Sequence, residues 1–393
     1  MPTIKDYLRW RGDLSFDERP FNDVDNVVLS ALAYVDFSGI VPGEDGGGIR
    51  LSLACQRLLA DNTRGITPYV RSLARIDDAF VELIADSRRF GSAILHDYVD
   101  VIDEGRSLQF AAVQVDLGER ETYVAFRGTD SSIVGWRENF MLSFEVTEAQ
   151  REAAAYLERA IDRAVVRGRT VRAGGHSKGG NLAEYAATCC PEELLTHVVR
   201  IYSNHGPGMA PGVMRHGWRE ALGNRLRLIV PSYSVIGMLF AREGDRRIVV
   251  ASSGAGIGQH DLTTWQVGPT GLLEVLGLQP DCMVVNRAIA SWGADLSLAE
   301  REEMTDEIFD ALSAGGATHL EEITRSKEGF QQVLRALRGL DERTRVVALT
   351  LVERTVDGSI DAVRRATEEA LGQWHDSLRD LANEAMRRLT GRS

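Results

Sequence analysis

Apolar and polar positions change their spacing several times along the chain, and each change predicts an element. Helical patterns reach about residue 90, and an apolar run at 27–35 predicts a helix packed on the core. Strand-like runs follow, and after residue 165 they alternate with helical or loop segments; they lie at 93–102, 109–115, 122–126, 170–173, 198–202, 226–230 and 248–251. This rhythm is typical of a largely parallel, doubly wound sheet flanked by helices.

The character of the sequence changes near residue 296. Ser297 and Glu300 form a capping box that opens a helix. Apolar residues then recur at spacings of three and four on the last helix; they are Val363, Ala366, Ala370, Trp374, Leu378, Leu381, Ala385 and Leu389. Such a face most often packs on its own protein, with a homo-oligomer contact or a membrane-surface role as the alternatives. We expect an α/β domain over residues 1–293 and a C-terminal helical region over residues 294–393.

Composition and charge narrow the classes of partner. A chain of 393 residues with 44% hydrophobic and 26% charged residues can bury a large core. Its net charge of −12 disfavours nucleic acid and anionic membranes as partners. The N-terminus lacks an apolar signal segment, and no later stretch approaches the roughly 20 apolar residues of a membrane span. The four cysteines show no C-x-x-C spacing. We therefore expect reduced thiols in a cytoplasmic protein without a membrane span.

A G-x-S-x-G pentapeptide, Gly175-His176-Ser177-Lys178-Gly179, lies between the strand-like run at 170–173 and a small-residue helix at 181–187. In this pattern a serine sits on a tight strand-to-helix turn, and the glycines leave room for the neighbouring strand and helix. The N-terminus of the helix directs its N–H groups toward a developing oxyanion. The pattern in this context predicts an α/β-hydrolase fold with Ser177 as the nucleophile of a serine hydrolase.

The order of catalytic residues in this fold, Ser then acid then His, selects among the histidines. His260 lies on a glycine-rich loop after the last core strand, where a general base can reach the serine. Other histidines lie before the nucleophile, inside the elbow, at the start of a strand or in the helical tail; these are His96, His176, His197, His319 and His375. We predict His260 as the base.

An oxyanion hole needs two backbone donors. One is the N–H of Lys178, directly after the nucleophile, and the other is expected from a loop that follows an earlier core strand. The segment after the strand at 122–126 supplies such a loop, with a flexible Gly128 before the hydroxyl residue Thr129. An ordinary β-turn is the alternative for this segment. We predict Thr129 and Lys178 as the oxyanion residues.

Several blocks resemble known lipase-like families. Phe126-Arg127-Gly128-Thr129, with Trp136 and Asn139 downstream, and the glycine-rich elbow resemble the signatures of class 3 (fungal-type) lipases. Residues 4 to about 270 look closer still to a bacterial family of lipase-like proteins of unknown function. The markers of that family are Tyr7-Leu8-Arg9-Trp10-Arg11-Gly12, Arg127-Gly128-Thr129-Asp130, Gly135-Trp136, His176-Ser177-Lys178-Gly179-Gly180-Asn181-Leu182, Gly206-Pro207-Gly208, and Gln259-His260-Asp261 with Trp265. The resemblance implies a lipase-like hydrolase domain in which Ser177 is the nucleophile, His260 the base and Thr129 an oxyanion residue.

No carboxylate occupies either place where the acid of the triad is expected. The loop after the strand at 226–230 reads Pro231-Ser232-Tyr233-Ser234-Val235. The position before Gly206-Pro207-Gly208, where the related family leads us to expect Asp, holds His205. Weak candidates elsewhere are Asp245, Glu243 and Asp261. A Ser-His dyad, a water or a displaced carboxylate would still support slower catalysis, so the acid stays unassigned.

The sequence therefore favours a cytoplasmic carboxylic ester hydrolase, lipase-like and without a cofactor, that acts on a small-molecule ester or acyl substrate. It has no H-E-x-x-H metal spacing, and no Lys-Ser/Thr pair follows Gly46-Gly47-Gly48 to make a phosphate loop. The alternative is a non-catalytic hydrolase-fold protein that binds an acyl ligand or a protein partner. A protease or acyltransferase on the same site is a weaker alternative. The apolar run at 235–240 predicts a buried core helix in preference to an acyl pocket or a lid.

Overall fold

The chain forms two compact units. The computed structural model describes residues 1–60, 65–71, 74–130, 132–142, 144–209, 214, 217–239, 244–280, 282–283, 296–319, 322–323, 326–341, 344–345 and 348. Contacts between Cα atoms group Met1–Asp130 with Met141–Leu296 in a first unit, and Ser131–Phe140 with Ser297–Ser393 in a second. Among the described residues, no helix is both long enough and apolar enough to cross a membrane.

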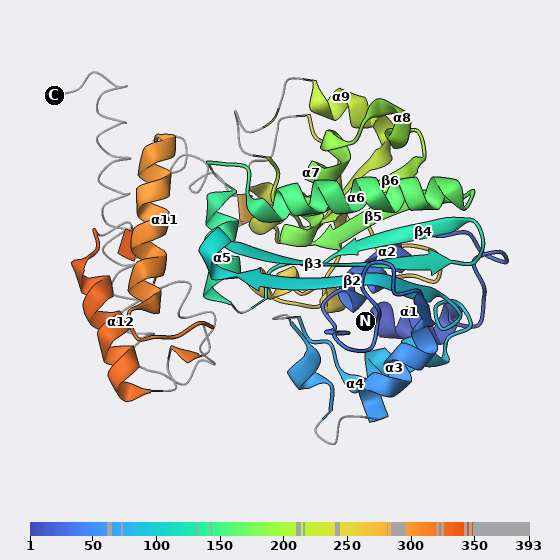
Figure 1. Ribbon diagram of the computed structural model, residues 1–393, viewed down its shortest axis with the longest axis horizontal. Coiled ribbons are helices and arrows are strands. Elements are labelled where there is room, and N and C mark those ends of the chain that lie inside the picture. The colour runs from blue at the N-terminus through green and yellow to red at the C-terminus, as the bar shows by residue number, and fades with distance from the viewer. Residues whose placement is uncertain are drawn as a thin grey trace. The chain divides into compact units, whose positions relative to one another are not determined.

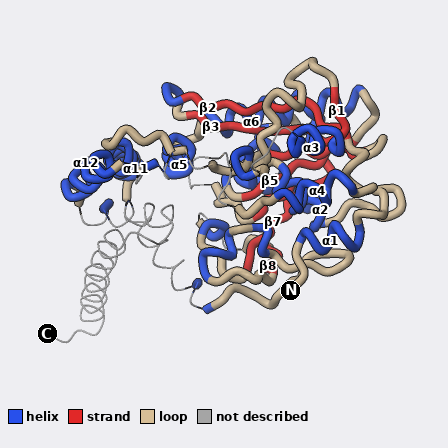
Figure 2. Tube along the Cα trace, turned by 90° about the horizontal axis from the view of Figure 1, so that it is seen from below, coloured by secondary structure: helices blue, strands red, loops and turns tan. Residues whose placement is uncertain are grey.

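The first unit is built on one sheet, in which the eight strands of the described chain lie side by side in sequence order (Figures 1 and 2). The strands are β1 (Gly48–Arg50), β2 (Ile94–Asp103), β3 (Leu108–Leu117), β4 (Glu121–Phe126), β5 (Thr170–His176), β6 (Val198–Asn204), β7 (Leu226–Pro231) and β8 (Arg247–Val250). Pairs from β1 to β4 are antiparallel, and pairs from β4 to β8 are parallel. This mostly parallel sheet, flanked by helices, confirms the α/β-hydrolase fold class.

Helices cover both faces of the sheet, with α6 on one side and α2 on the other (Figure 1). The helices of the first unit are α1 (Ile4–Arg11), α2 (Asp23–Leu32), α3 (Leu51–Ala60), α4 (Asp78–Asp86), α6 (Glu148–Val166), α7 (Lys178–Cys189), α8 (Glu192–Leu195) and α9 (Trp218–Leu222). Single 3₁₀ turns are η1 (Thr67–Tyr69), η2 (Glu104–Arg106), η3 (Gly223–Arg225), η4 (Ile236–Met238), η5 (Gly256–His260) and η6 (Leu262–Thr264). Side-chain caps lie at the N-termini of the two helices that cover the faces of the sheet. Asn22 accepts from the N–H of Val24 at α2, and Thr147 accepts from the N–H of Gln150 at α6.

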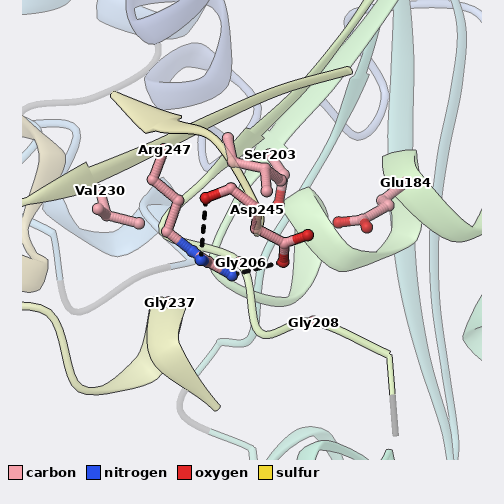
Figure 3. Close-up of a pocket in the computed structure, with 9 residues that line it drawn as sticks. Glu184, Ser203, Gly206, Gly208, Val230, Gly237, Asp245 and Arg247 are labelled. Carbon is pink, nitrogen blue, oxygen red and sulfur yellow. Dashed lines mark hydrogen bonds and ion pairs between the residues drawn. The ribbon is translucent and has the colours of Figure 1, made fainter. Parts of the chain in front are cut away.

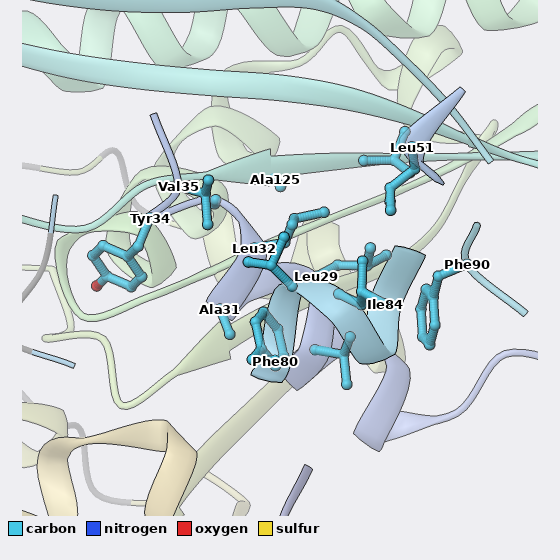
Figure 4. Close-up of a cluster of buried hydrophobic side chains, with 14 of the residues drawn as sticks. Leu29, Ala31, Leu32, Tyr34, Val35, Leu51, Phe80, Ile84, Phe90 and Ala125 are labelled. Carbon is cyan, nitrogen blue, oxygen red and sulfur yellow. The ribbon is translucent and has the colours of Figure 1, made fainter. Parts of the chain in front are cut away.

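The sheet separates two hydrophobic cores. On β4, Tyr123 and Ala125 pack with α1 to α4, whereas Val124 and Phe126 pack with α6 and α7. Successive side chains of a strand point to opposite faces, so one strand serves both cores. Figure 4 shows part of the first core, with side chains from α2 and α4 that include Leu29, Leu32, Phe80 and Ile84.

Buried amides join α2 to the carboxyl ends of the central strands. Asn26 donates to Asn204 Oδ1 (2.8 Å), and Asn204 donates to Asn26 Oδ1 (3.0 Å) and to the Gly175 carbonyl oxygen (3.0 Å). The Tyr123 hydroxyl donates to Asn26 Oδ1 at 2.8 Å. These bonds satisfy polar groups that would otherwise be costly to bury. They fix the ends of β5 and β6, which are the strands that lead into the site.

The second unit contains α5 (Ile133–Met141), α11 (Leu298–Ser313) and α12 (Lys327–Gly339). The predicted capping box is present, because Ser297 Oγ accepts from the Glu300 N–H and Glu300 Oε2 accepts from the Ser297 N–H. Ile133 on α5 packs in one cluster with Phe309 on α11 and Val333 on α12. The helix predicted at 363–389 lies outside the described residues.

Most predicted strands match the observed ones to within two residues. β5 is the exception, since it continues beyond 170–173 to His176 through two glycines that carry no apolar signal. The core helix predicted at 235–240 was wrong for the described residues 235–239, which hold only the turn η4. The segment bonds to another loop, since the Leu239 carbonyl oxygen accepts from the Gly208 N–H (2.8 Å).

Candidate active site

Ser177 occupies a strained strand-to-helix turn. It follows β5, precedes α7 and has φ 56° and ψ −128°. This positive φ is uncommon for a residue with a side chain and is stored at functional turns. The turn is tight, since a Cβ at Gly179 would lie 2.2 Å from the Phe126 carbonyl oxygen. The geometry is that of a nucleophile elbow, which presents its side chain at the carboxyl end of the sheet.

His205 occupies the matching place on the neighbouring strand. His176 pairs with Asn204 in the parallel register of β5 and β6, so Ser177 and His205 are the next residues on each strand. His205 also has a positive φ, 54°. Its N–H donates to the Ile229 carbonyl oxygen (2.7 Å), which holds the backbone against β7. The two strained residues therefore leave the sheet side by side.

His260 reaches this place from the loop after β8, the last strand in the order of the sheet. It ends η5, on the loop that follows β8, and its Nδ1 lies 2.8 Å from Nδ1 of His205. The loop is anchored by Gln259, whose Oε1 accepts from the Tyr233 N–H (2.9 Å). The indole N–H of Trp265 donates to the Gln259 carbonyl oxygen (2.9 Å). The predicted base thus sits on a fixed loop and faces a second imidazole.

His176, the residue before the nucleophile, ties this loop to the elbow. Its Nε2 lies 2.8 Å from the His260 carbonyl oxygen, and its Nδ1 lies 2.9 Å from the Tyr34 hydroxyl. A carbonyl only accepts, so Nε2 carries the proton and Nδ1 accepts from Tyr34. Burial, then the neighbouring His260, hold the pKa of His176 well below its usual value. His176 is therefore a neutral support with both nitrogens engaged.

The three histidines also form a cluster with the spacing of a metal site. Within the described chain, His176, His205 and His260 are the group whose ligand atoms could hold a metal ion, all within 4.8 Å of one another. A metal would have to displace Tyr34 to reach the lone pair of His176. The cluster has no local spacing in the sequence, because its members follow or end three different strands, β5, β6 and β8.

The segment predicted to supply an oxyanion donor, residues 127–130, follows β4, which is paired with β5 through Phe126 and Gly175; we call this segment the oxyanion loop. Arg127 is buried and donates two hydrogen bonds of 2.6 Å to the Asp100 carboxylate, which fixes the start of the loop. Gly128 passes close to the elbow, since a Cβ there would lie 2.5 Å from the His176 carbonyl oxygen. Thr129 comes next, so it and Ser177 leave neighbouring strands at the same edge.

Lys178 begins α7, so its main chain lies at the N-terminus of that helix. Its side chain is buried, and Nζ donates to the carbonyl oxygen (2.6 Å) and to Oε1 (2.9 Å) of Gln109. The ammonium group thus bonds to β3, and the main-chain N–H that was predicted as an oxyanion donor lies at the start of α7.

The weak acid candidates have other partners. Asp261 caps η6 and accepts from the Thr263 N–H (2.9 Å) and hydroxyl (2.7 Å). Asp245 accepts from Arg247 (2.7 Å) and lines a small pocket with Glu184 and Ser203 (Figure 3). Glu243 lies outside the described residues. The first of the two expected places, residues 231–235, supplies Tyr233 to the Gln259 contact and contains no carboxylate.

Two of the sequence blocks that carry the family resemblance are in contact beside the elbow. Asn181 on α7 donates to the carbonyl oxygens of Pro207 (3.1 Å) and Gly208 (3.2 Å). Gly206 packs against the same helix, since a Cβ there would lie 2.8 Å from the Asn181 nitrogen. The segment after His205 is therefore clamped to α7.

Comparison with known proteins identifies the family of the chain. Residues 84–310, more than half of the chain, match the model of the family described as Mbeg1-like. Among solved structures, the crystal structure of M37 lipase aligns with 15% identity and a TM-score of 0.33, over 54% of this chain and 68% of that one. No curated protein matches the chain. The predicted resemblance to a lipase-like family is confirmed, and it supports a hydrolase-like function in general: the chain belongs to the Mbeg1-like family.

Proposed function

We propose that the protein is a serine hydrolase that cleaves carboxylic esters, with Ser177 as nucleophile and His260 as base. The observation that carries the proposal is the strained elbow at Ser177, with φ 56°, to which the loop of His260 is bound by a hydrogen bond of 2.8 Å from His176. Strain at a single serine is retained where the surrounding structure requires it, and a nucleophile elbow is such a case.

In the reaction, Ser177 Oγ attacks the ester carbonyl carbon while its proton passes to Nε2 of His260. The carbonyl oxygen becomes an oxyanion, which accepts hydrogen bonds from the backbone N–H groups of Thr129 and Lys178. The positive end of the α7 dipole stabilises the same charge. The ester C–O bond then breaks to leave an acyl group on Ser177, and His260 gives its proton to the leaving alkoxide. A water molecule loses a proton to His260 and attacks the acyl carbon. The bond from that carbon to Ser177 Oγ breaks as His260 returns the proton to Oγ, which releases the acid and restores Ser177.

A fluorophosphonate probe tests the nucleophile. We expect the probe to label wild type at Ser177 and to inhibit turnover of a short acyl ester. Ser177→Ala should abolish labelling and lower kcat by at least about 10⁴-fold. Ser92→Ala, at an exposed serine outside the site, is the control and should label like wild type. A folded wild-type protein that reacts with neither probe nor ester would contradict the proposal.

The second candidate is a hydrolase-fold protein that binds an acyl ligand without turning it over. The observation that favours it is the imidazole of His205 behind His260, where hydrolases of this fold place a carboxylate. Ester turnover that is present in wild type and lost in His260→Ala would dispose of this alternative. Binding of a fatty acid by a protein that shows no turnover would support it.

A further inference from the structure

We propose that His205 replaces the carboxylate of the triad, and that its Nδ1 accepts a hydrogen bond from the Nδ1–H of His260. It is a positioning residue, because it acts on the substrate only through His260. The inference rests on the proposed function, which assigns His260 as the base. It assigns a role to a position that the sequence left open.

The contact has the geometry of an acid–base pair. Nδ1 of His and Oδ1 of Asp are both bonded to Cγ, so the two atoms occupy equivalent positions when the side chains share a rotamer. The observed distance of 2.8 Å between the Nδ1 atoms is the distance that a carboxylate oxygen would make to the same base. His205 also has φ 54°, in the left-handed region where Asp, Asn and His are enriched among non-glycine residues.

Counting protons fixes the direction of this bond. Only one of the two facing Nδ1 atoms can carry a hydrogen when both rings are neutral. If His205 donated, the proton of His260 would sit on Nε2, and His260 could not accept the serine proton. If His260 donates, its Nε2 carries the lone pair that a base needs. The catalytic tautomer therefore requires that His205 accepts.

When Nδ1 of His205 accepts this hydrogen bond, Nε2 of the same ring carries the proton and is buried. In the described chain its Nε2 is buried without a hydrogen-bond partner. The adjacent ring carbon, Cδ2, packs against Gly237. A Cβ placed on Gly237 would lie 2.6 Å from this carbon. The fixed packing prevents the ring from turning, so Nδ1 stays directed at His260.

His205 remains neutral while His260 gains and loses its proton. Burial, then the proximity of His260 and His176, hold the pKa of His205 well below its usual value. A lowered pKa disfavours transfer of the proton from His260 to His205, so His205 acts as the acceptor of the hydrogen bond. A neutral acceptor orients the base but stabilises the imidazolium less than a carboxylate does. We expect an enzyme slower than one with Asp at this position.

Three variants of the full-length protein test the role in ester turnover. His205→Gly removes the acceptor in a backbone conformation that glycine adopts readily. It should lower kcat by about 10³- to 10⁴-fold with little change in KM, and added imidazole should restore part of the rate. His205→Asp should turn over ester at least as fast as wild type. His96→Asn, at another buried histidine that lies 3.2 Å from Asp116, is the control and should keep the wild-type kcat.

The outcomes separate this inference from the proposed function. Ester turnover by His205→Gly at the wild-type rate would overturn the role of His205. It would leave the proposed roles of Ser177 and His260 in place. Failure of the fluorophosphonate probe to label wild type would overturn the proposed function. Nitrogen-15 spectra of the histidine rings then show which ring nitrogen carries the proton, and they need no measurement of turnover. We expect His260 protonated at Nδ1 in wild type and at Nε2 in His205→Gly, and a wild-type proton on Nε2 would refute the inference.

Discussion

Backbone strain at single residues marks the site. Ser177 and His205 have φ values of 56° and 54°, at the ends of two neighbouring parallel strands. Each such conformation costs about 1–3 kcal/mol for a residue with a side chain. Hydrogen bonds from both N–H groups to the next strand, at 2.9 and 2.7 Å, offset part of that cost. The strain places a hydroxyl and an imidazole on one edge of the sheet.

The buried histidines should also make stability depend on pH. Burial and then neighbouring histidines lower the pKa of His176 and His205 well below the usual 6.5. Both pKa values return to about 6.5 on unfolding, so below that pH the unfolded chain binds more protons. The contribution of these two histidines to the free energy of unfolding is therefore complete above about pH 6.5. As the pH falls below that value, each histidine lowers the free energy of unfolding by up to about 1.4 kcal/mol per pH unit.

His205→Asn tests this dependence. The amide fits the left-handed backbone and carries no titrating proton in this range. Below about pH 6.5, the slope of the free energy of unfolding against pH should decrease by up to about 1.4 kcal/mol per unit relative to wild type. Urea unfolding at a series of pH values measures both slopes. Equal slopes would show that His205 is not held neutral in the folded state.

The sequence predicted part of the site and left one partner open. Ser177 carries a local signal, since its turn needs glycines at fixed spacing, and His260 follows from chain order. His205 carries no such signal, because an imidazole in the place of a carboxylate is recognised only by what its Nδ1 touches. His176 was located inside the elbow from the sequence, but its contact with Tyr34 spans 142 positions of the chain and has no local signal.

At the scale of elements, one tyrosine connects the loops of the site. Tyr34, which follows α2, donates to His176 at the elbow. His176 in turn donates to the carbonyl oxygen of His260, on the loop of η5 that we call the base loop. Burial raises the pKa of Tyr34, and a backbone hydrogen bond from Gly128 on the oxyanion loop lowers it by less. The N-terminal helices therefore contribute to the site as well as to the core.

Tyr34→Phe tests this connection. Without the hydroxyl, Nδ1 of His176 loses its donor inside the protein, which costs about 1–3 kcal/mol of stability. The base loop should become less fixed, and we expect kcat for the ester to fall by about tenfold with the fold retained, a loss of about 1.4 kcal/mol in transition-state stabilisation. Tyr69→Phe, at a partly buried tyrosine in η1, is the control. Turnover in Tyr34→Phe at the wild-type rate would show that the elbow and the base loop need no such link.

Elements were predictable where one physical signal dominated. The alternating strands were located because apolar runs in a doubly wound sheet are long and bounded by turns. The helix expected at 235–240 was wrong for the described residues 235–239, because this segment is held by hydrogen bonds and packing to other loops. Ser234, just before η4, donates its N–H to Cys282 Sγ (3.1 Å), and Gly237 packs against His205. Such contacts are set by tertiary structure and leave no periodic pattern.

At the scale of the whole molecule, the chain enters its second unit twice. Residues 131–140 belong with the helices after Leu296, although they follow the oxyanion loop directly in sequence. Ile133 on α5 donates its N–H to the Thr318 carbonyl oxygen (2.9 Å). A short helix inside an α/β pattern does not reveal which core it joins, so this grouping could not be predicted from the sequence. It connects the C-terminal helices to the segment that carries Thr129.

Phe309→Ala tests whether the second unit supports the oxyanion loop. The Phe309 ring packs edge-to-face on Phe140 of α5, with centroids 5.3 Å apart. Removing it should destabilise the second unit by about 3–5 kcal/mol. Since α5 begins four residues after Thr129, we also expect kcat to fall while labelling of Ser177 persists at a lower rate. Leu298→Ala, on α11 with 55% of its surface exposed, should change neither quantity. A destabilised second unit with full ester turnover would show that the first unit alone holds the loop in its active position.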